Sequence, residues 1–171
     1  MKQLVTLEGR TVIVTGAAQG IGKACCELAL ELGANTVGID LNAEGVAALG
    51  KDRSDGRYLS FVGSVTDPKF VESTCAAIVE RFGAIHGLVN NAGVIRPAMI
   101  EKMTLEQWQT VIDVHMTGSF LWLQVPAATW SSEPRPARRT PARSSTSRPT
   151  PASAARSAKS TMQRRRPACS A

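Results

Sequence analysis

Three glycines near the start of the chain have the spacing of an anion-binding turn. Gly16, Gly20 and Gly22 follow the β-branched run Thr11–Thr15 and precede an apolar pattern typical of a helix. In this order Gly16 lets the backbone turn, Gly20 keeps side-chain atoms away from a bound group, and Gly22 lets the helix pack closely on the strand. The free N–H groups of the first helical turn, and the positive end of the helix dipole, then face the anion. We therefore expect a diphosphate to bind where this strand meets the helix.

An acidic residue indicates that the diphosphate belongs to a dinucleotide. Asp40 ends a second apolar run and lies 18 residues after Gly22, close to the spacing of a carboxylate that binds a ribose. Its negative charge repels a 2′-phosphate, and no Arg or Lys lies in the glycine turn or directly after Asp40. The pattern favours NAD over NADP. The alternative is that Asp40 is only a solvated acid at the end of a strand.

A third motif completes a set that resembles a known family. Asn-Asn-Ala-Gly at Asn90–Gly93 follows a further apolar strand, and Thr15–Gly22 fits Thr-Gly-x-x-x-Gly-x-Gly. With Asp40, these motifs resemble the short-chain dehydrogenase/reductase family over residues 1–124. The resemblance implies an NAD-dependent oxidoreductase that interconverts small alcohols and ketones by hydride transfer, commonly as a homodimer or homotetramer. The cofactor-binding positions that it implies are Gly16, Gln19, Gly20, Ile21, Gly22, Asp40, Ser64, Val65, Asn91, Ala92 and Gly93.

The chain departs from the family pattern at two places, after the third strand and in the last helix. The family often has an acid after the third strand that binds adenine. This chain has Ser64 and Val65 there, so the Ser64 hydroxyl and the Val65 backbone would have to bind the adenine. Where the family usually has Asn in a long helix, this chain has His115. A histidine at that point is a weak candidate for the catalytic proton relay, since it can hold a water. The interpretation we favour is a hydrogen-bonded core residue.

Strand and helix patterns alternate along the first part of the chain. The strands are expected at 11–15, 36–40, 58–63 and 87–90, and the helices at 21–32, 43–49, 67–82 and 104–123. This alternation predicts a Rossmann-like, doubly wound parallel α/β sheet that is truncated after its fourth strand, with the strand order 3-2-1-4. Strand 87–90 would then be an open edge of the sheet.

Apolar residues recur at helical spacing in these helices, and those of helix 67–82 should pack on the sheet. On the first helix the expected apolar positions are Ala24, Cys25, Leu28, Leu30 and Leu32; on helix 67–82 they are Val71, Cys75, Ile78, Val79 and Phe82. Helix 104–123 begins with a capping pattern at Thr104 and places Trp108, Val111, Ile112 and His115 on one face. The four cysteines, Cys25, Cys26, Cys75 and Cys169, lack the spacing of a zinc site, so we expect buried free thiols and no metal.

The residues after 124 have a different composition. Residues 125–171 hold nine Arg, one Lys and one Glu, a net charge of +9, and they contain no Gly, Leu, Ile or Phe. The whole chain has a net charge of +6, so residues 1–124 carry −3. We expect this tail to be disordered. One interpretation is a basic arm that binds nucleic acid or an anionic surface.

A second interpretation is that the tail is read out of frame. The family's catalytic Ser and Tyr-x-x-x-Lys are missing, and the sole tyrosine, Tyr58, has Val62 four positions later. With suitable codons, Thr161–Ala171 read from the third base gives Tyr-Ala-Ala-Ala-Lys-Ala-Gly, and Arg143–Arg148 gives Ile-Val-Asn-Ile-Ser. We therefore hypothesise a frameshift near Gln124–Ala128.

The expected product is a poorly stable NAD-binding fragment without turnover. Neither a signal peptide nor a run of about 18 apolar residues is present, so we expect a cytoplasmic protein that does not enter a membrane. A non-catalytic NAD-binding module and a nucleic-acid binder are the alternatives to the enzyme.

Overall fold

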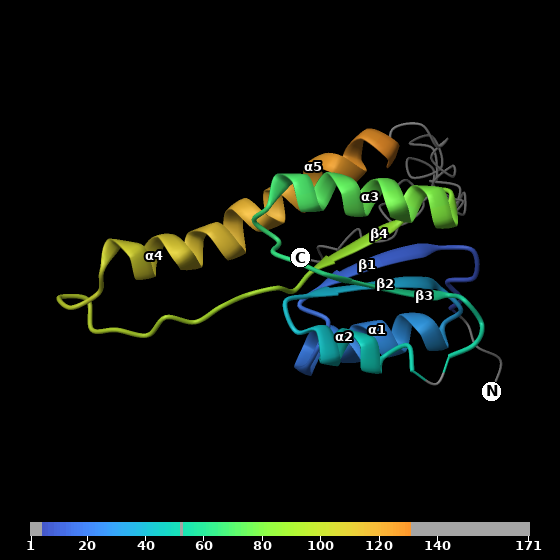
Figure 1. The fold of residues 1–171 in the computed structure, drawn as a ribbon, viewed down its shortest axis with the longest axis horizontal. Helices are drawn as coiled ribbons and strands as arrows, with labels where there is room; N and C mark the ends of the chain where they lie inside the picture. Colours follow the sequence, from blue (N-terminus) through green and yellow to red (C-terminus); the bar gives the residue numbers. More distant parts are fainter. Residues whose placement is uncertain (1–4, 52, 131–171) are drawn as a thin grey trace, which may run out of the picture. The chain divides into compact units, whose positions relative to one another are not determined.

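The centre of the structure is a sheet of four parallel strands in the order β3-β2-β1-β4 (Figure 1). The computed structural model describes residues 5–51 and 53–130, with side chains through residue 125. The strands are β1 (Thr11–Thr15), β2 (Asn35–Asp40), β3 (Tyr58–Val62) and β4 (Gly87–Asn90). The predicted Rossmann-like sheet and its strand order are confirmed. The order reverses at β1, between β2 and β4, which is the switch point where open α/β sheets bind ligands.

Helices cover both faces of this sheet (Figure 1). On one face lie α1 (Gly20–Glu31) and α2 (Ala43–Ala48); on the other lie α3 (Pro68–Phe82) and α5 (Gly118–Trp130). Successive residues of β1 serve the two faces, because side chains alternate along a strand. Ile13 joins the core under α3 and α5, together with Trp122, while Val14 joins the core under α1 and α2, together with Cys26.

The predicted apolar face of α3 is confirmed. Val71, Cys75 and Ile78 are buried, and Val79 and Phe82 pack against the same core. The helix starts sharply because Asp67 caps it, accepting a hydrogen bond from Lys69 N at 3.0 Å, and Pro68 follows. Proline at this position loses no hydrogen bond, since the first N–H groups of a helix have no partner inside it.

Only part of the apolar pattern on α1 is buried. Leu30 is 1% exposed, whereas Leu28 is 55% and Ile21 75% exposed; the buried residues of this helix are Gly22, Cys26, Ala29 and Leu30. The reason lies in the glycine turn, because Gly22 must face the backbone of Gly16, where a Cβ atom would collide with the Gly16 carbonyl oxygen. That contact sets the rotation of the helix about its axis, and apolar spacing alone did not reveal it.

The helix expected at 104–123 is continuous in direction but not uniform. It consists of α4 (Leu105–Ile112), the π-helical segment η1 (Asp113–Thr117) and α5. The capping box at its start is confirmed, since Thr104 Oγ1 accepts from Gln107 N and Gln107 Oε1 accepts from Thr104 N. α4 and η1 bury no residue among those described.

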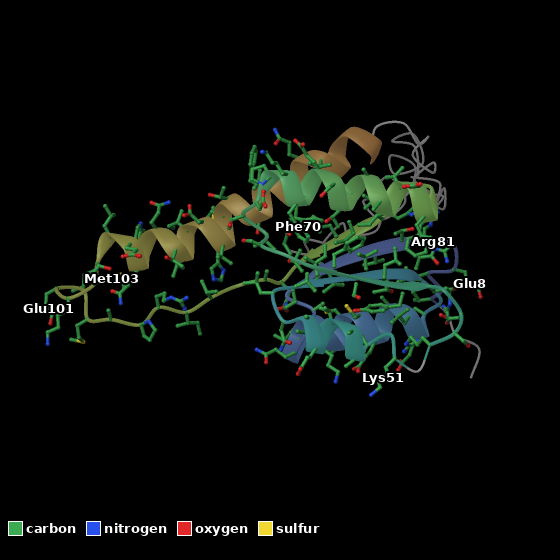
Figure 2. The ribbon with its side chains drawn as sticks, in the orientation of Figure 1. Glu8, Lys51, Phe70, Arg81, Glu101 and Met103 are labelled. Carbon is green, nitrogen blue, oxygen red and sulfur yellow. The ribbon has the colours of Figure 1, made fainter. Side chains whose placement is uncertain are left out.

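A long connection leads from β4 to α4. Glu101 and Met103 lie at its far end, away from the sheet (Figure 2), and Ile100 is 84% exposed. The end of the chain differs from the prediction in one respect: α5 continues to Trp130, so residues 125–130 are helical and not part of a disordered tail. The rest of the predicted tail, 131–171, lies outside the described residues. Within the described part of the chain no helix has the length and apolarity needed to cross a membrane.

Candidate functional site

The glycine turn between β1 and α1 has the shape that an approaching anion requires. Gly16 and Gly20 have φ angles of +68° and +54°, in the region that side chains other than glycine rarely adopt. A Cβ atom at Gly20 would have open space around it, so this part of the backbone faces a cavity. At Gly16 it would lie 2.9 Å from the Cα of Ala92, because the residues after β4 cross closely over the turn.

Among α1, α2, α3 and α4, only α1 begins without a hydrogen bond from a capping side chain. The side chains of Asn42, Asp67 and Thr104 cap α2, α3 and α4, whereas Gln19 makes no side-chain hydrogen bond to the start of α1. The first N–H groups of α1 are therefore left without a capping side chain, beside the open space at Gly20. Such groups attract a phosphate through hydrogen bonds and through the helix dipole.

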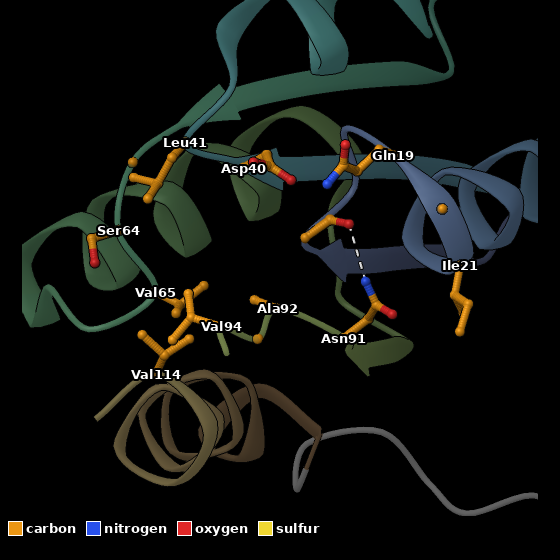
Figure 3. Close-up of a pocket in the computed structure, with 14 residues that line it drawn as sticks. Gln19, Ile21, Asp40, Leu41, Ser64, Val65, Asn91, Ala92, Val94 and Val114 are labelled. Carbon is orange, nitrogen blue, oxygen red and sulfur yellow. Dashed lines mark hydrogen bonds between the residues drawn. The ribbon is translucent and has the colours of Figure 1, made fainter. Parts of the chain in front are cut away.

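A cavity of about 520 Å³ opens at this end of the sheet (Figure 3). Every predicted cofactor-binding residue lines it except Gly22, which is buried beneath the turn. The structure adds four lining residues that the motifs did not indicate: Leu41, Gly63, Val94 and Val114. Leu41, Gly63 and Val94 directly adjoin predicted positions in the sequence and could have been inferred from them. Val114 comes from η1 and had no signal.

Asp40 is held in one orientation by the backbone around it. Its Oδ2 accepts a hydrogen bond from Ala18 N and its Oδ1 accepts one from Asn42 N, both at 3.0 Å. Each carboxylate oxygen can accept a further bond, and the side chain lines the cavity. Among the described residues that line the cavity, Asp40 is the only one with a charged side chain. The bonds from Ala18 and Asn42 fix the orientation of the Asp40 carboxylate at the wall of the cavity.

Asn91 acts on the turn and not only on the cavity. Its Nδ2 donates to the carbonyl oxygens of Thr15 at 3.2 Å and Gly16 at 3.0 Å, and the second of these bonds is drawn in Figure 3. The buried Thr15 hydroxyl accepts hydrogen bonds from Asn91 N and Ala92 N, each at 3.1 Å. These bonds tie the segment after β4 to the glycine turn, so both walls of the cavity are fixed relative to each other.

Ser64 is already engaged within its own turn. Its Oγ accepts a hydrogen bond from Thr66 N at 3.2 Å and lies 2.8 Å from Thr66 Oγ1, where either hydroxyl can donate. The neighbouring Val65 is 9% exposed and packs in the core under α3. The side chain that replaces the family's acid thus serves first to shape the turn before α3.

His115 does not line the cavity, and the prediction that it is a core residue is wrong, because its side chain is exposed. It is hydrogen-bonded, as expected: its Nε2 lies 3.1 Å from both the nitrogen and the oxygen of Val94. This atom can accept from the Val94 N–H or donate to the Val94 carbonyl, depending on the tautomer, but it cannot do both. The ring also lies over Gly93, where a Cβ atom would approach it to 2.5 Å.

The thiols in the described part of the chain are free, and two are buried as expected. Burial raises the pKa of Cys26 to about 12, with smaller contributions from Cys25 and Glu27, and burial raises the pKa of Cys75 to about 11. Cys25 is half-buried, and Cys169 lies outside the described residues. No group of three or more metal-binding side chains occurs among the residues that the structure describes.

Comparisons with known proteins agree with this geometry. The short chain dehydrogenase family matches residues 10–135, beyond the residue 124 at which the motifs appeared to stop. D-threitol dehydrogenase of Mycolicibacterium smegmatis is 39% identical over 122 residues, which are 69% of this chain and 46% of that protein. The 3-oxoacyl-[acyl-carrier-protein] reductase FabG of Thermotoga maritima is 37% identical over 116 residues, covering 67% and 47% of the two chains.

Solved structures give the same result. The short-chain dehydrogenase/reductase described as a glucose/ribitol dehydrogenase from Brucella melitensis superposes with a TM-score of 0.71 at 31% identity. The match covers 74% of this chain and 54% of that one. The chain spans about half the length of the curated relatives that it matches. On these grounds the chain belongs to the short chain dehydrogenase family.

Proposed function

We propose that residues 11–93 bind a nicotinamide dinucleotide, NAD in preference to NADP. The single observation that carries the proposal is the cavity that joins the uncapped start of α1 to the carboxylate of Asp40. The residues fit the cofactor: the N–H groups after Gly20 suit the diphosphate, and Asp40 suits the adenosine ribose. The acidic side chain and the absence of any Lys or Arg among the described lining residues disfavour a 2′-phosphate.

We propose that the intact family fold is an oxidoreductase acting on an alcohol or a ketone. When bound, the nicotinamide would accept or donate a hydride. The similar proteins named above are two dehydrogenases and a reductase, which supports this reaction type. This chain's own residues bind and orient the dinucleotide, but the sequence contains no Tyr-x-x-x-Lys to exchange the proton of a substrate hydroxyl. The chain as written is therefore proposed to bind NAD without turnover.

The choice of nucleotide is tested by comparing the affinities for NAD and NADP by calorimetric titration. Wild type is expected to prefer NAD, and Asp40→Asn to reduce that preference by roughly 10- to 100-fold, since hydrogen bonds to charged groups contribute about 1.5–3 kcal/mol. The control is Asp55→Asn, which removes an acid that is paired with Arg57 and does not line the cavity. Equal preference in wild type and Asp40→Asn would refute the role of Asp40.

We also propose that the basic tail arises from a shift of reading frame near Gln124–Ala128. Its support is the recovery of two family motifs in the same shifted frame and in the family's order. Sequencing the DNA across codons 115–171 tests this directly. One or two inserted or deleted bases are expected; a coding sequence whose other frames lack both motifs would refute the shift. In that case steeply salt-dependent nucleic-acid binding, lost on deleting residues 125–171, would favour the basic arm instead.

A further inference from the structure

The outermost strand on one side of the sheet, β3, has a free edge. The order β3-β2-β1-β4 gives β3 a single neighbour, β2. The ladder between them begins with a hydrogen bond from Thr36 N to Arg57 O at 2.7 Å. Successive residues of a strand direct their N–H and C=O groups to opposite sides, so those of Tyr58, Ser60 and Val62 point away from β2. Among the residues that the structure describes, none bonds to these outward backbone groups.

β3 lacks the features that protect an edge strand. Charged side chains, proline and bulges prevent the edge of a sheet from pairing with another chain. The five residues of β3, Tyr-Leu-Ser-Phe-Val, include no charged residue and no proline, and they pair with β2 in an unbroken register. Ser60 is exposed and Val62 is 51% exposed. This edge is therefore able to accept a further strand.

A groove of about 680 Å³ runs along this edge, on the side of α2. Its floor includes Tyr58 and Ser60, and Tyr58 is held in place because its hydroxyl donates to Val46 O at 2.8 Å. The groove also has two charged side chains, both exposed: Glu44 lies in the first turn of α2, and Lys51 lies beyond its end. Within the described part of the chain, neither of these charges is in an ion pair.

The positions of the two charges fix the orientation in which a second copy fits. Because β2 and β3 are parallel and α2 starts directly after β2, Glu44 lies near the end of β3 that Val62 occupies. Lys51 lies near the opposite end, since the adjacent Gly50 packs against the ring of Tyr58. If two β3 strands pair antiparallel about a two-fold axis, Lys51 of each copy faces Glu44 of the other. A parallel pair would instead place equal charges at the same end of the joint.

From these features we infer that two copies of the chain associate through β3, in antiparallel orientation, and join their sheets into one. Ser60 lies opposite its own counterpart at the two-fold axis, and Val62 of the second copy lies opposite Tyr58. Aromatic and β-branched side chains that face each other across antiparallel strands stabilise the pairing. The surface is self-complementary, as a two-fold interface requires. The groove and the nucleotide cavity have no lining residue in common, so the inference is independent of the proposed NAD binding.

Sedimentation equilibrium of the full chain measures this association. Dimers are expected, and Ser60→Lys should raise their Kd by about tenfold or more, because like charges directly opposite each other repel. Ser60→Pro should also weaken the dimer: it removes an N–H group that faces away from β2, a position where edge strands tolerate proline. Ser73→Lys adds the same charge at an exposed site on α3 and is expected to leave the Kd unchanged. A monomeric wild type, or a dimer that neither Ser60 variant weakens, would overturn the inference.

Exchanging the two charges of the groove tests the antiparallel orientation without altering β3. Glu44→Lys and Lys51→Glu should each raise the Kd by about threefold or more, since each places like charges across the joint on both sides of the axis. The double variant restores opposite charges and is expected to recover the Kd of the wild type. A double variant that dimerises no better than the single variants would overturn the assigned orientation.

A disulfide tests the position of the two-fold axis. Residues of a hydrogen-bonded antiparallel pair have Cα atoms about 5.5 Å apart, within reach of a disulfide bond. In a chain that carries Cys25→Ser and Cys169→Ser, Ser60→Cys is expected to form a covalent dimer on oxidation, and Ser73→Cys to remain monomeric under the same conditions. The absence of a covalent dimer in Ser60→Cys, or equal yields in the two variants, would overturn the inference.

Discussion

The sheet with its glycine turn and the helical arm of α4 and η1 differ in how far their apolar residues are buried. In the sheet region, Ile13, Val37 and Ile39 are fully buried, and a Cβ atom at Gly16 or Gly22 would collide with neighbouring backbone. In the arm, Leu105 is 78% exposed and Trp108 54% exposed. Both regions are rich in apolar residues, but only the first has elements packed on both sides.

This difference shows what stabilises each region. Burial of apolar surface, about 25 cal/mol per Å², stabilises the sheet. The arm depends on local bonds: the capping box at Thr104, the Thr110 hydroxyl donating to Glu106 O at 2.8 Å, and Gln109 donating to Asp113 at 2.8 Å. Short helices with such support alone are marginal in water. We expect the arm to open far more readily than the sheet.

Two of the three tryptophans, Trp122 and Trp108, give the largest expected contrast. Trp122 is fully buried and meets Phe70 edge to face with ring centroids 6.4 Å apart. Trp122→Ala is expected to lower the free energy of unfolding by about 3–5 kcal/mol, and Trp108→Ala to change it by less than about 0.5 kcal/mol. Urea unfolding followed by circular dichroism measures both. Comparable losses in the two variants would contradict the division into a packed region and an unpacked arm.

The glycine turn gives the next contrast. Gly22→Ala places a methyl group against the Gly16 carbonyl and near Asn91 Nδ2, so it must push α1 away from β1. We expect a loss of about 1–3 kcal/mol or more. Gly20→Ala meets no neighbouring atom and carries only the strain of φ +54°, about 1–2 kcal/mol. Thermal unfolding that ranks Gly20→Ala as the more damaging change would show that α1 does not pack as described.

The buried thiols predict a loss of stability in alkali. Cys26 has a folded-state pKa of about 12 against 9.0 for a free thiol, so between these values the unfolded chain releases a proton that the folded chain retains. Stability is therefore unaffected below about pH 9 and falls as the pH rises toward 12, by at most about 1.4 kcal/mol per pH unit for this group. Cys26→Ala is expected to show a shallower alkaline decline in urea titrations from pH 8 to 10. An unchanged slope would mean that Cys26 is accessible to solvent.

The bond between His115 and Val94 gives the smallest expected effect. It joins the arm to the segment that lines the cavity, and its loss in His115→Ala should cost about 1 kcal/mol. His115→Asn is expected to restore stability, because an amide can donate to the Val94 carbonyl and accept from its N–H group at the same time. If His115→Asn is as destabilised as His115→Ala, the contact with Val94 is not what His115 contributes.

The sequence was sufficient for features that depend on local chemistry. The glycine turn, the strand order, the capping box at Thr104 and the position of Asp40 at the end of β2 all follow from residue types at short spacing. Features that depend on packing were missed. The rotation of α1 is set by Gly22 against Gly16, and apolar spacing alone did not show that Leu28 is exposed. The exposed state of Trp108 and His115 depends on which elements lie beside the arm, and Val114 reaches the cavity only through the tertiary fold.

Hydrogen–deuterium exchange of the full chain, with and without NAD, tests the central claim most directly. Without NAD, amides of β1, β2 and α1 are expected to exchange slowly and those of α4 and η1 quickly, since exchange reports local opening. With NAD, exchange should slow further at residues 16–22 and at the ends of β2 and β3, and remain fast in residues 105–112. Unchanged exchange at the glycine turn, or protection confined to residues outside the cavity, would contradict the proposed site.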